Sequence, residues 1–132
     1  MSKLEIMAVD DSALTLKKLT AMLEGLGHQV VKTCKSGMEA VDTFKYFKEK
    51  GLARPDLVTM DITMPEMDGI SATRRILALD PQALIIMVTS HGQEQMVIEA
   101  IEAGAKGYVL KPFKPEKLKA SIDQVVSRYK ES

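Results

Sequence analysis

Leu57-Val58-Thr59-Met60-Asp61 is the stretch that decides the fold: four residues suited to a buried strand, followed at once by an acid. The run does not alternate between apolar and polar residues, and Leu84-Ile85-Ile86-Met87-Val88 is nearly as continuous. Runs of this kind are typical of parallel strands that are buried on both faces. Both stretches therefore predict central strands of a sheet that helices cover on its two sides.

Working outward from these runs, short apolar segments with β-branched residues complete a set of five predicted strands. They cover residues 4–9, 29–34, 56–60, 83–89 and 107–110. Between and after them, apolar side chains recur at helical spacing and predict five helices. The five stripes are Leu16, Leu19, Leu23 and Leu26; Ala40, Phe44 and Phe47; Ile70, Thr73 and Ile76 or Leu77; Val97, Ala100 and Ile101; and Leu118, Ile122, Val125 and Tyr129.

The order of these segments is strand then helix, five times over. It predicts an α/β protein: a doubly wound, five-stranded parallel sheet with helices on both faces and right-handed crossovers. The length of 132 residues suits one domain, which we expect to span residues 1–132. The chain shows no internal repeat and no interdomain linker.

Composition excludes several classes of function. The 18 Lys and Arg residues balance 18 Asp and Glu residues, so no general attraction to nucleic acid or to an anionic membrane is predicted. No apolar run approaches the roughly 20 residues needed to span a bilayer, and no signal-peptide pattern begins the chain. The single cysteine, Cys34, excludes an internal disulfide and fits a reducing compartment. We therefore expect a cytoplasmic protein.

Polar residues follow the predicted strands at the point where each strand ends. They are Asp10-Asp11 after the first strand, Asp61 after the third, Thr89-Ser90 at the end of the fourth and Lys111-Pro112 after the fifth. Parallel pairing brings the carboxyl ends of strands to one edge, about 4.8 Å apart from neighbour to neighbour, and ligands of such sheets bind at that edge. The sequence therefore predicts one shared site.

Three carboxylates in close proximity need a counter-cation to remain ionised. Mg²⁺ fits, because it accepts carboxylates, a carbonyl and waters as ligands. Lys111 adds a positive charge and Thr89 a hydroxyl donor, so the set suits a phosphoryl group, whose transfer depends on positioning and charge neutralisation. Taken singly, each residue has an ordinary alternative as a helix cap, a turn residue or a surface lysine; their convergence at one edge favours the site.

These motifs together resemble the receiver domains of two-component response regulators. The resemblance runs from about Leu4 to Tyr129. Its pieces are Val9-Asp10-Asp11-Ser12, Asp61-Ile62-Thr63-Met64-Pro65-Glu66-Met67-Asp68-Gly69, Val88-Thr89-Ser90, Ala103-Gly104-Ala105-Lys106-Gly107-Tyr108 and Lys111-Pro112-Phe113. It implies a flavodoxin-like (CheY-like) sheet with the strand order 2-1-3-4-5. The subgroup that the chain resembles most is the free-standing, chemotaxis-type receivers.

The resemblance also implies roles. Asp61 is the phosphoacceptor, with Mg²⁺ bound by Asp61, by Asp11 directly, by Asp10 through water and by the backbone carbonyl of Thr63. Lys111, preceding a cis Pro112, contacts the phosphoryl group, as does Thr89, whose movement lets Tyr108 turn inward. The implied chemistry is that of a signalling switch rather than an enzyme with a separate substrate.

Two further expectations concern the rim and the surface. Thr63 and His91 lie two residues past Asp61 and Thr89, respectively, and they either tune autodephosphorylation or are rim residues without effect.

Met96, Val97 and Ile98 are consecutive on a helix and span about 200° of its circumference, so at least one is exposed. With Lys106 and Tyr108, the resemblance favours a partner surface formed by the fourth helix, fifth strand and fifth helix.

The implied partners are a sensor histidine kinase as phosphodonor, an output protein such as a flagellar motor switch component, and a phosphatase.

A phosphorelay intermediate or phosphate sink without motor output is the alternative function. A metal-dependent hydrolase is a third, but such enzymes usually carry a second acid two residues after the nucleophile, where this chain has Thr63. A flavin site would need a phosphate-cradling loop where Asp10 and Asp11 stand. We expect a monomer, although phosphorylation-driven dimerisation stays open.

Overall fold

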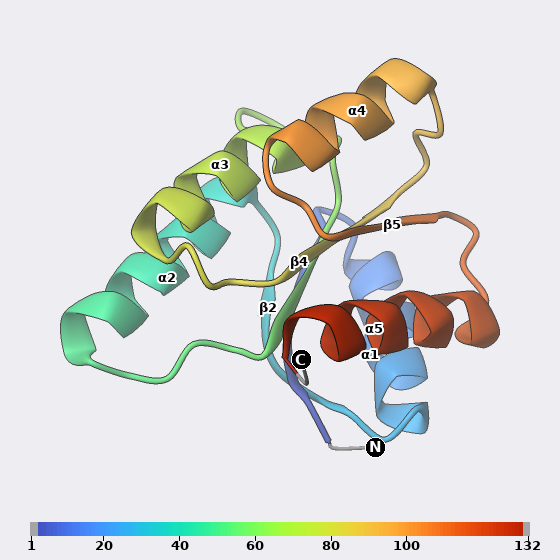
Figure 1. Cartoon of the computed structure of the whole chain (residues 1–132), viewed down its shortest axis with the longest axis horizontal. Coiled ribbons are helices and arrows are strands. Elements are labelled where there is room, and N and C mark those ends of the chain that lie inside the picture. Colours follow the sequence, from blue (N-terminus) through green and yellow to red (C-terminus); the bar gives the residue numbers. More distant parts are fainter. Residues whose placement is uncertain (1–2, 131–132) are drawn as a thin grey trace.

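The computed structural model describes residues 3–130, and the rest of the predicted domain, residues 1–2 and 131–132, lies outside that range. Ten elements alternate along the chain (Figure 1). They are β1 (Glu5–Val9), α1 (Ala13–Gly25), β2 (Gln29–Cys34), α2 (Gly37–Lys50), β3 (Leu57–Met60), α3 (Gly69–Leu79), β4 (Ile85–Thr89), α4 (Glu94–Glu102), β5 (Gly107–Leu110) and α5 (Pro115–Tyr129).

The five strands form one parallel sheet in the order β2-β1-β3-β4-β5, as the resemblance implied. The helices cover both faces, with α1 and α5 on one side and α2, α3 and α4 on the other (Figure 1). Every residue of β3 and β4 is buried, which confirms the prediction made from their continuous apolar runs. No helix within residues 3–130 is long and apolar enough to cross a membrane.

Local sequence signals fix where the helices begin and end. Ser12, Ser36 and Asp68 cap α1, α2 and α3, and each side chain accepts a hydrogen bond from a backbone N–H three residues later. Gly51 ends α2 with φ of 66°, a left-handed conformation that favours glycine. The connections that follow β1 and β3 are therefore held at defined positions, and these carry the acids.

Two of the predicted stripes are wrong in part. The Tyr129 side chain is 43% exposed, because Val126 completes the buried face of α5 instead, and the Lys106 ammonium lies 5.0 Å from the Tyr129 ring centroid. On α4, Ile101 is 50% exposed and only Ala100 is fully buried. Ile98, at 43%, confirms that one of the three consecutive apolar residues is exposed.

Candidate functional site

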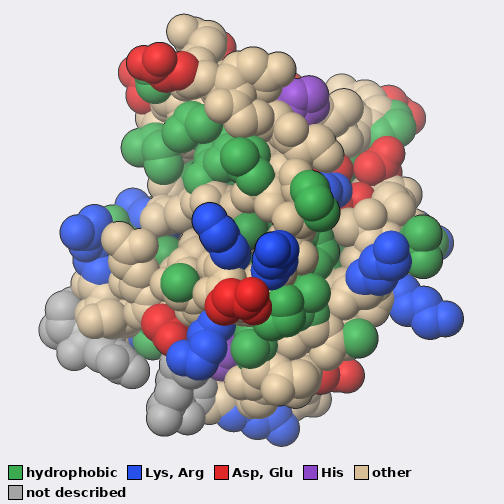
Figure 2. Space-filling view, turned by 90° about the vertical axis from the view of Figure 1, so that its right-hand side faces the viewer, with side chains coloured by type: hydrophobic (Ala, Val, Ile, Leu, Met, Phe, Trp, Pro, Cys, Tyr) green, Lys and Arg blue, Asp and Glu red, His purple; other side chains and the backbone are tan. Residues whose placement is uncertain are grey.

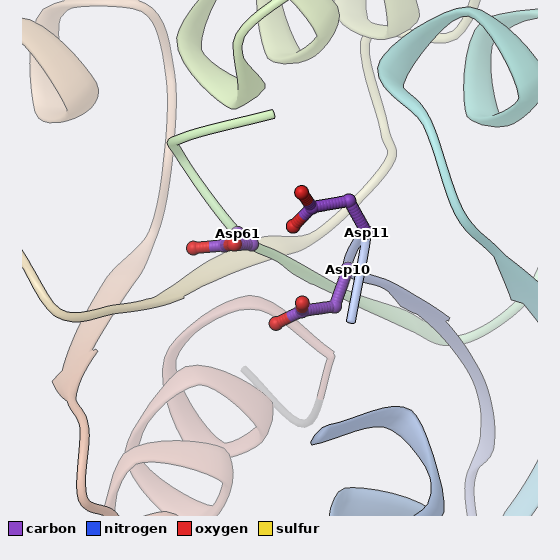
Figure 3. A group of neighbouring side chains, drawn as sticks. All are labelled: Asp10, Asp11 and Asp61. Atoms are coloured by element: carbon purple, nitrogen blue, oxygen red, sulfur yellow. The ribbon is translucent and has the colours of Figure 1, made fainter. Parts of the chain in front are cut away.

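The acids after β1 and β3 meet at the carboxyl edge of the sheet. Each of Asp10, Asp11 and Asp61 places a carboxylate oxygen so that the three atoms lie within 4.8 Å of one another. Figure 3 shows the three carboxylates gathered on the same side of the strand ends. Asp10 and Asp61 are 2% and 7% exposed, while Asp11 is open to solvent. The structure thus brings together the three acids predicted from the sequence.

Backbone hydrogen bonds hold these acids in register. The Asp10 N–H donates to the Cys34 carbonyl at 3.0 Å, and the Asp61 N–H donates to the Val9 carbonyl at 3.0 Å. The Asp10 carboxylate also accepts a hydrogen bond from the Ser12 N–H at 2.9 Å. Ser12 caps α1, so the alternative that Asp10 or Asp11 serves as the cap of this helix is wrong.

Gly69 belongs to the motif that follows Asp61, but its structural role was not predicted from the sequence. A Cβ atom at this position would lie 2.0 Å from the Asp61 carbonyl oxygen, which no side chain could accept. Its N–H donates to the Ile62 carbonyl at 2.7 Å and ties the start of α3 to the segment after Asp61. The Asp68-Gly69 pair, a cap followed by a residue without a Cβ, is the signal that could have revealed this role.

Lys111 supplies the positive charge of the site. Its Nζ atom lies 2.7 Å from Asp10 Oδ2 and 3.6 Å from Asp61 Oδ2. The Lys111–Pro112 bond is cis, as expected. Burial raises the pKa of Asp61, the charge of Asp10 raises it further, and the Lys111 ammonium opposes both effects. Carboxyl groups whose pKa is raised in this way are common at functional sites.

Thr89 and Tyr108 are joined through the backbone of His91. Thr89 is fully buried, and its hydroxyl oxygen accepts a hydrogen bond from the His91 N–H at 3.3 Å. The Tyr108 hydroxyl donates to the His91 carbonyl at 2.6 Å. The sequence predicted the two side chains but not this link, because any residue type can supply the N–H and the carbonyl.

Thr63 lies on the rim of the site, where its hydroxyl hydrogen bonds with His91 Nε2. This contact joins the connection after β3 to the connection after β4, so the two residues suspected of tuning the chemistry touch each other. The ligand role of the Thr63 backbone carbonyl stays a prediction.

The donor set fits a hard divalent cation. Carboxylate oxygens are the ligands that Mg²⁺ prefers, and a cation would relieve the mutual repulsion that raises the pKa of Asp61. In residues 3–130 this is the one group of three or more His, Cys, Asp or Glu side chains placed to share an ion. Asp10, Asp11 and Asp61 could therefore hold a metal.

Known proteins with similar sequences and folds place the chain in a family. The chain is 42% identical to the chemotaxis protein CheY of Thermotoga maritima over 120 residues, which cover 91% of this chain and 95% of that protein. It is 43% identical to the chemotaxis protein CheY of Bacillus subtilis, covering 92% and 97%.

Among solved structures, the CheX–CheY–BeF3–Mg²⁺ complex of Borrelia burgdorferi contains a similar chain, with a TM-score of 0.84 and 35% identity over 92% of this chain and 88% of that one. The model of the response regulator receiver domain matches residues 6–123. With the acids, the lysine and the sheet order that the structure shows, this match means that the chain belongs to the response regulator receiver domain family.

Proposed function

We propose that this single-domain chain is the response regulator of a chemotaxis-type two-component system, with Asp61 as the phosphoacceptor. The observation that carries the proposal is the convergence of Asp10, Asp11 and Asp61 with the Lys111 ammonium at one sheet edge. The named CheY relatives support the chemotaxis assignment. The chain is a switch with no substrate beyond the phosphoryl group that it takes and hydrolyses, and it acts in the cytoplasm as a monomer.

In the reaction, an Asp61 carboxylate oxygen attacks the phosphorus of a phosphohistidine on a partner kinase. The phosphorus–nitrogen bond breaks as the phosphorus–oxygen bond forms. When bound by Asp10, Asp11, Asp61 and the Thr63 carbonyl, Mg²⁺ supplies positive charge that offsets the carboxylates and the incoming phosphoryl oxygens. Lys111, whose Nζ atom lies 3.6 Å from Asp61 Oδ2, would contact an oxygen of the phosphoryl group on Asp61.

The phosphoryl group then changes the surface of the protein. It adds about −1.5 to −2 charge and three acceptor oxygens, and the Thr89 hydroxyl, now bonded to the His91 N–H, can turn to donate to one of them. Because Thr89 and Tyr108 both bond to the backbone of His91, a movement of Thr89 is coupled to the position of Tyr108. A local charge change thereby reaches the outer face of β5.

That outer face has the character of a binding surface. Ile98, Ile101 and Leu110 of α4 and β5 are 43%, 50% and 49% exposed. Figure 2 shows hydrophobic side chains gathered on the upper part of this face, with basic side chains below them. We assign the α4–β5–α5 face to the output partner, such as a flagellar motor switch component, and name a histidine kinase and a phosphatase as the other partners.

Incubation with acetyl phosphate and Mg²⁺ tests the phosphoacceptor. The wild-type chain should gain the mass of one phosphoryl group, and Asp61→Asn should not, because an amide oxygen is too weak a nucleophile. Removal of Mg²⁺ with EDTA should abolish the gain. A mass shift that persists in Asp61→Asn would refute the assignment.

Tyr108→Ala tests the output face. Phosphorylation by acetyl phosphate should remain within about twofold of wild type, while binding of a motor switch peptide to the chain activated with beryllium fluoride should fall at least tenfold, as for a central interface residue. Unchanged peptide binding would instead favour the relay or phosphate-sink function.

A further inference from the structure

A groove opens beside Asp11, on the side of the site away from β5. It has a volume of about 460 Å³ and lies between the β2–α2 and β3–α3 connections. Its lining residues are Asp11, Lys35, Ser36, Met38, Pro65, Glu66 and Met67, and we call it the Asp11 groove. Among these lining residues the phosphoacceptor chemistry uses Asp11 alone, and the α4–β5–α5 face uses none of them.

The two connections that flank the Asp11 groove lie close together in the free protein. Gly37, at the start of α2, lies so near the β3–α3 connection that a Cβ atom there would be 2.9 Å from the Met67 carbonyl oxygen and 3.2 Å from Met67 Cγ. The two connections are therefore packed against each other. A preformed groove loses less conformational entropy on binding than one that must be ordered.

The wall is apolar and the rim is charged. Met38 is 43% exposed, and Pro65 and half-buried Met67 extend the apolar surface. Lys35 and Glu66 stand on the two opposite connections, and neither side chain has an ion-pair partner in residues 3–130. The groove thus offers a flexible methionine surface that suits an apolar side chain. The Lys35 ammonium and the Glu66 carboxylate flank this surface.

The position of Asp11 links this groove to the phosphoryl site. Asp11 lines the groove, and its carboxylate oxygen lies within 4.8 Å of those of Asp10 and Asp61. A protein that brings a phosphohistidine to Asp61 must cover the surface around the site. The Asp11 groove is continuous with that surface, because Asp11 belongs to both.

We propose that the Asp11 groove is a docking site for the phosphodonor protein. An apolar side chain of the donor, near its phosphohistidine, packs against Met38 and Met67, with an acidic donor residue facing Lys35 and a basic one facing Glu66. The inference rests on the proposed function, because it requires a protein donor for Asp61. It assigns the specificity for that donor to residues outside the phosphoacceptor machinery.

Two donors of different size test the proposal. The protein donor is a histidine-kinase phosphotransfer domain, phosphorylated on its histidine with radiolabelled phosphate and chosen because it phosphorylates the wild-type chain. The small donor is acetyl phosphate with Mg²⁺, which has no surface to dock. The variants are Met38→Gln and Lys35→Glu, and the matched control is Leu52→Gln, since Leu52 is 51% exposed and follows the far end of α2.

Each groove variant should lower kcat/KM for transfer from the protein donor about tenfold, the size expected for one interface contact. Phosphorylation by acetyl phosphate and the thermal midpoint should stay at wild-type values, and Leu52→Gln should match wild type with both donors. Unchanged transfer from the protein donor overturns the docking site, and so does an equal loss with both donors, which would place these residues in the chemistry. If the wild-type chain accepts no phosphoryl group from acetyl phosphate, the proposed function itself fails.

Discussion

Thr59 is a fully buried residue of β3 whose hydroxyl oxygen has no hydrogen-bond partner in the described structure. An unsatisfied buried hydroxyl costs about 1–3 kcal/mol of stability, and an apolar group of the same shape removes that cost. Thr59→Val should therefore raise the free energy of unfolding by about 1 kcal/mol in urea denaturation. Thr43→Val is the control, because the Thr43 hydroxyl donates to the Glu39 carbonyl at 2.8 Å, and this variant should gain no stability. Equal effects in the two variants would contradict the argument.

His28 should make stability depend on pH. Its Nδ1 atom accepts a hydrogen bond from the Leu4 N–H at 3.2 Å, so the neutral ring is the one that fits. Burial lowers the pKa of His28. The negative charge of Asp123 raises this pKa in part, and the positive charge of Lys119 lowers it. Because the folded pKa lies below the unfolded value near 6.5, the stability that neutral His28 contributes is complete above pH 6.5 and is lost as pH falls below it.

The variant His28→Asn isolates this contribution, because an amide oxygen can accept the Leu4 N–H but does not titrate in this range. The difference in unfolding free energy between wild type and His28→Asn should shift against the wild type as pH falls from about 7.5 to 5.5. Urea denaturation at stepped pH measures it. A difference that stays constant over that range would show that His28 remains neutral or that its bond to Leu4 contributes nothing.

At the scale of elements, the contact between Thr63 and His91 joins two connections that border Asp61. We expect this contact to limit the access of attacking water, so that His91→Ala shortens the lifetime of the acyl phosphate several-fold. Release of radiolabelled phosphate from the phosphorylated chain measures the lifetime. Gln93→Ala is the control, because Gln93 lies on the same connection and its side chain makes no capping hydrogen bond. An unchanged lifetime in His91→Ala would show that Thr63 and His91 are rim residues without effect on autodephosphorylation.

Elements differ in how far the sequence predicts them. The strands β3 and β4 were predictable because burial on both faces demands continuous apolar runs, and all nine of their residues are buried. Helix α4 was predicted less well, since Ile101 was placed in its core stripe yet is exposed, and spacing alone cannot distinguish a core stripe from a partner surface. Packing decides between the two, and packing is a property of the whole sheet.

The same limit applies to the site. The acids were predictable because each follows a strand, and strand polarity brings all of them to one edge. The partner of Lys111 was not predictable: its Nζ atom lies nearer to Asp10 than to Asp61, the carboxylate that the phosphoryl group is proposed to modify. Distances of 2.7 and 3.6 Å depend on the rotamer of one lysine, which no sequence pattern encodes.

At the scale of the whole molecule, the carboxyl edge of the sheet concentrates negative charge in a chain whose formal net charge is zero. The repulsion among Asp10, Asp11 and Asp61 opposes folding, and a bound cation should relieve it. Anything that binds only the folded state stabilises it by mass action, about 2.7 kcal/mol at a hundred times its Kd. Stability should therefore rise with Mg²⁺ concentration, and urea denaturation in EDTA and in rising MgCl₂ measures the increase.

Asp11→Asn shows whether that increase comes from the proposed site. Asp11 is exposed and has no ion-pair partner in residues 3–130, so its replacement should leave the metal-free protein as stable as wild type or slightly more so. The response to Mg²⁺ should shrink by most of its size, because one of three carboxylates is gone. Asp42→Asn removes another exposed acid, on α2 and outside the group of three, and should keep the full response. An equal response in all three proteins would mean that Mg²⁺ binds elsewhere. Mg²⁺ could then not supply the positive charge that phosphoryl transfer to Asp61 is proposed to require.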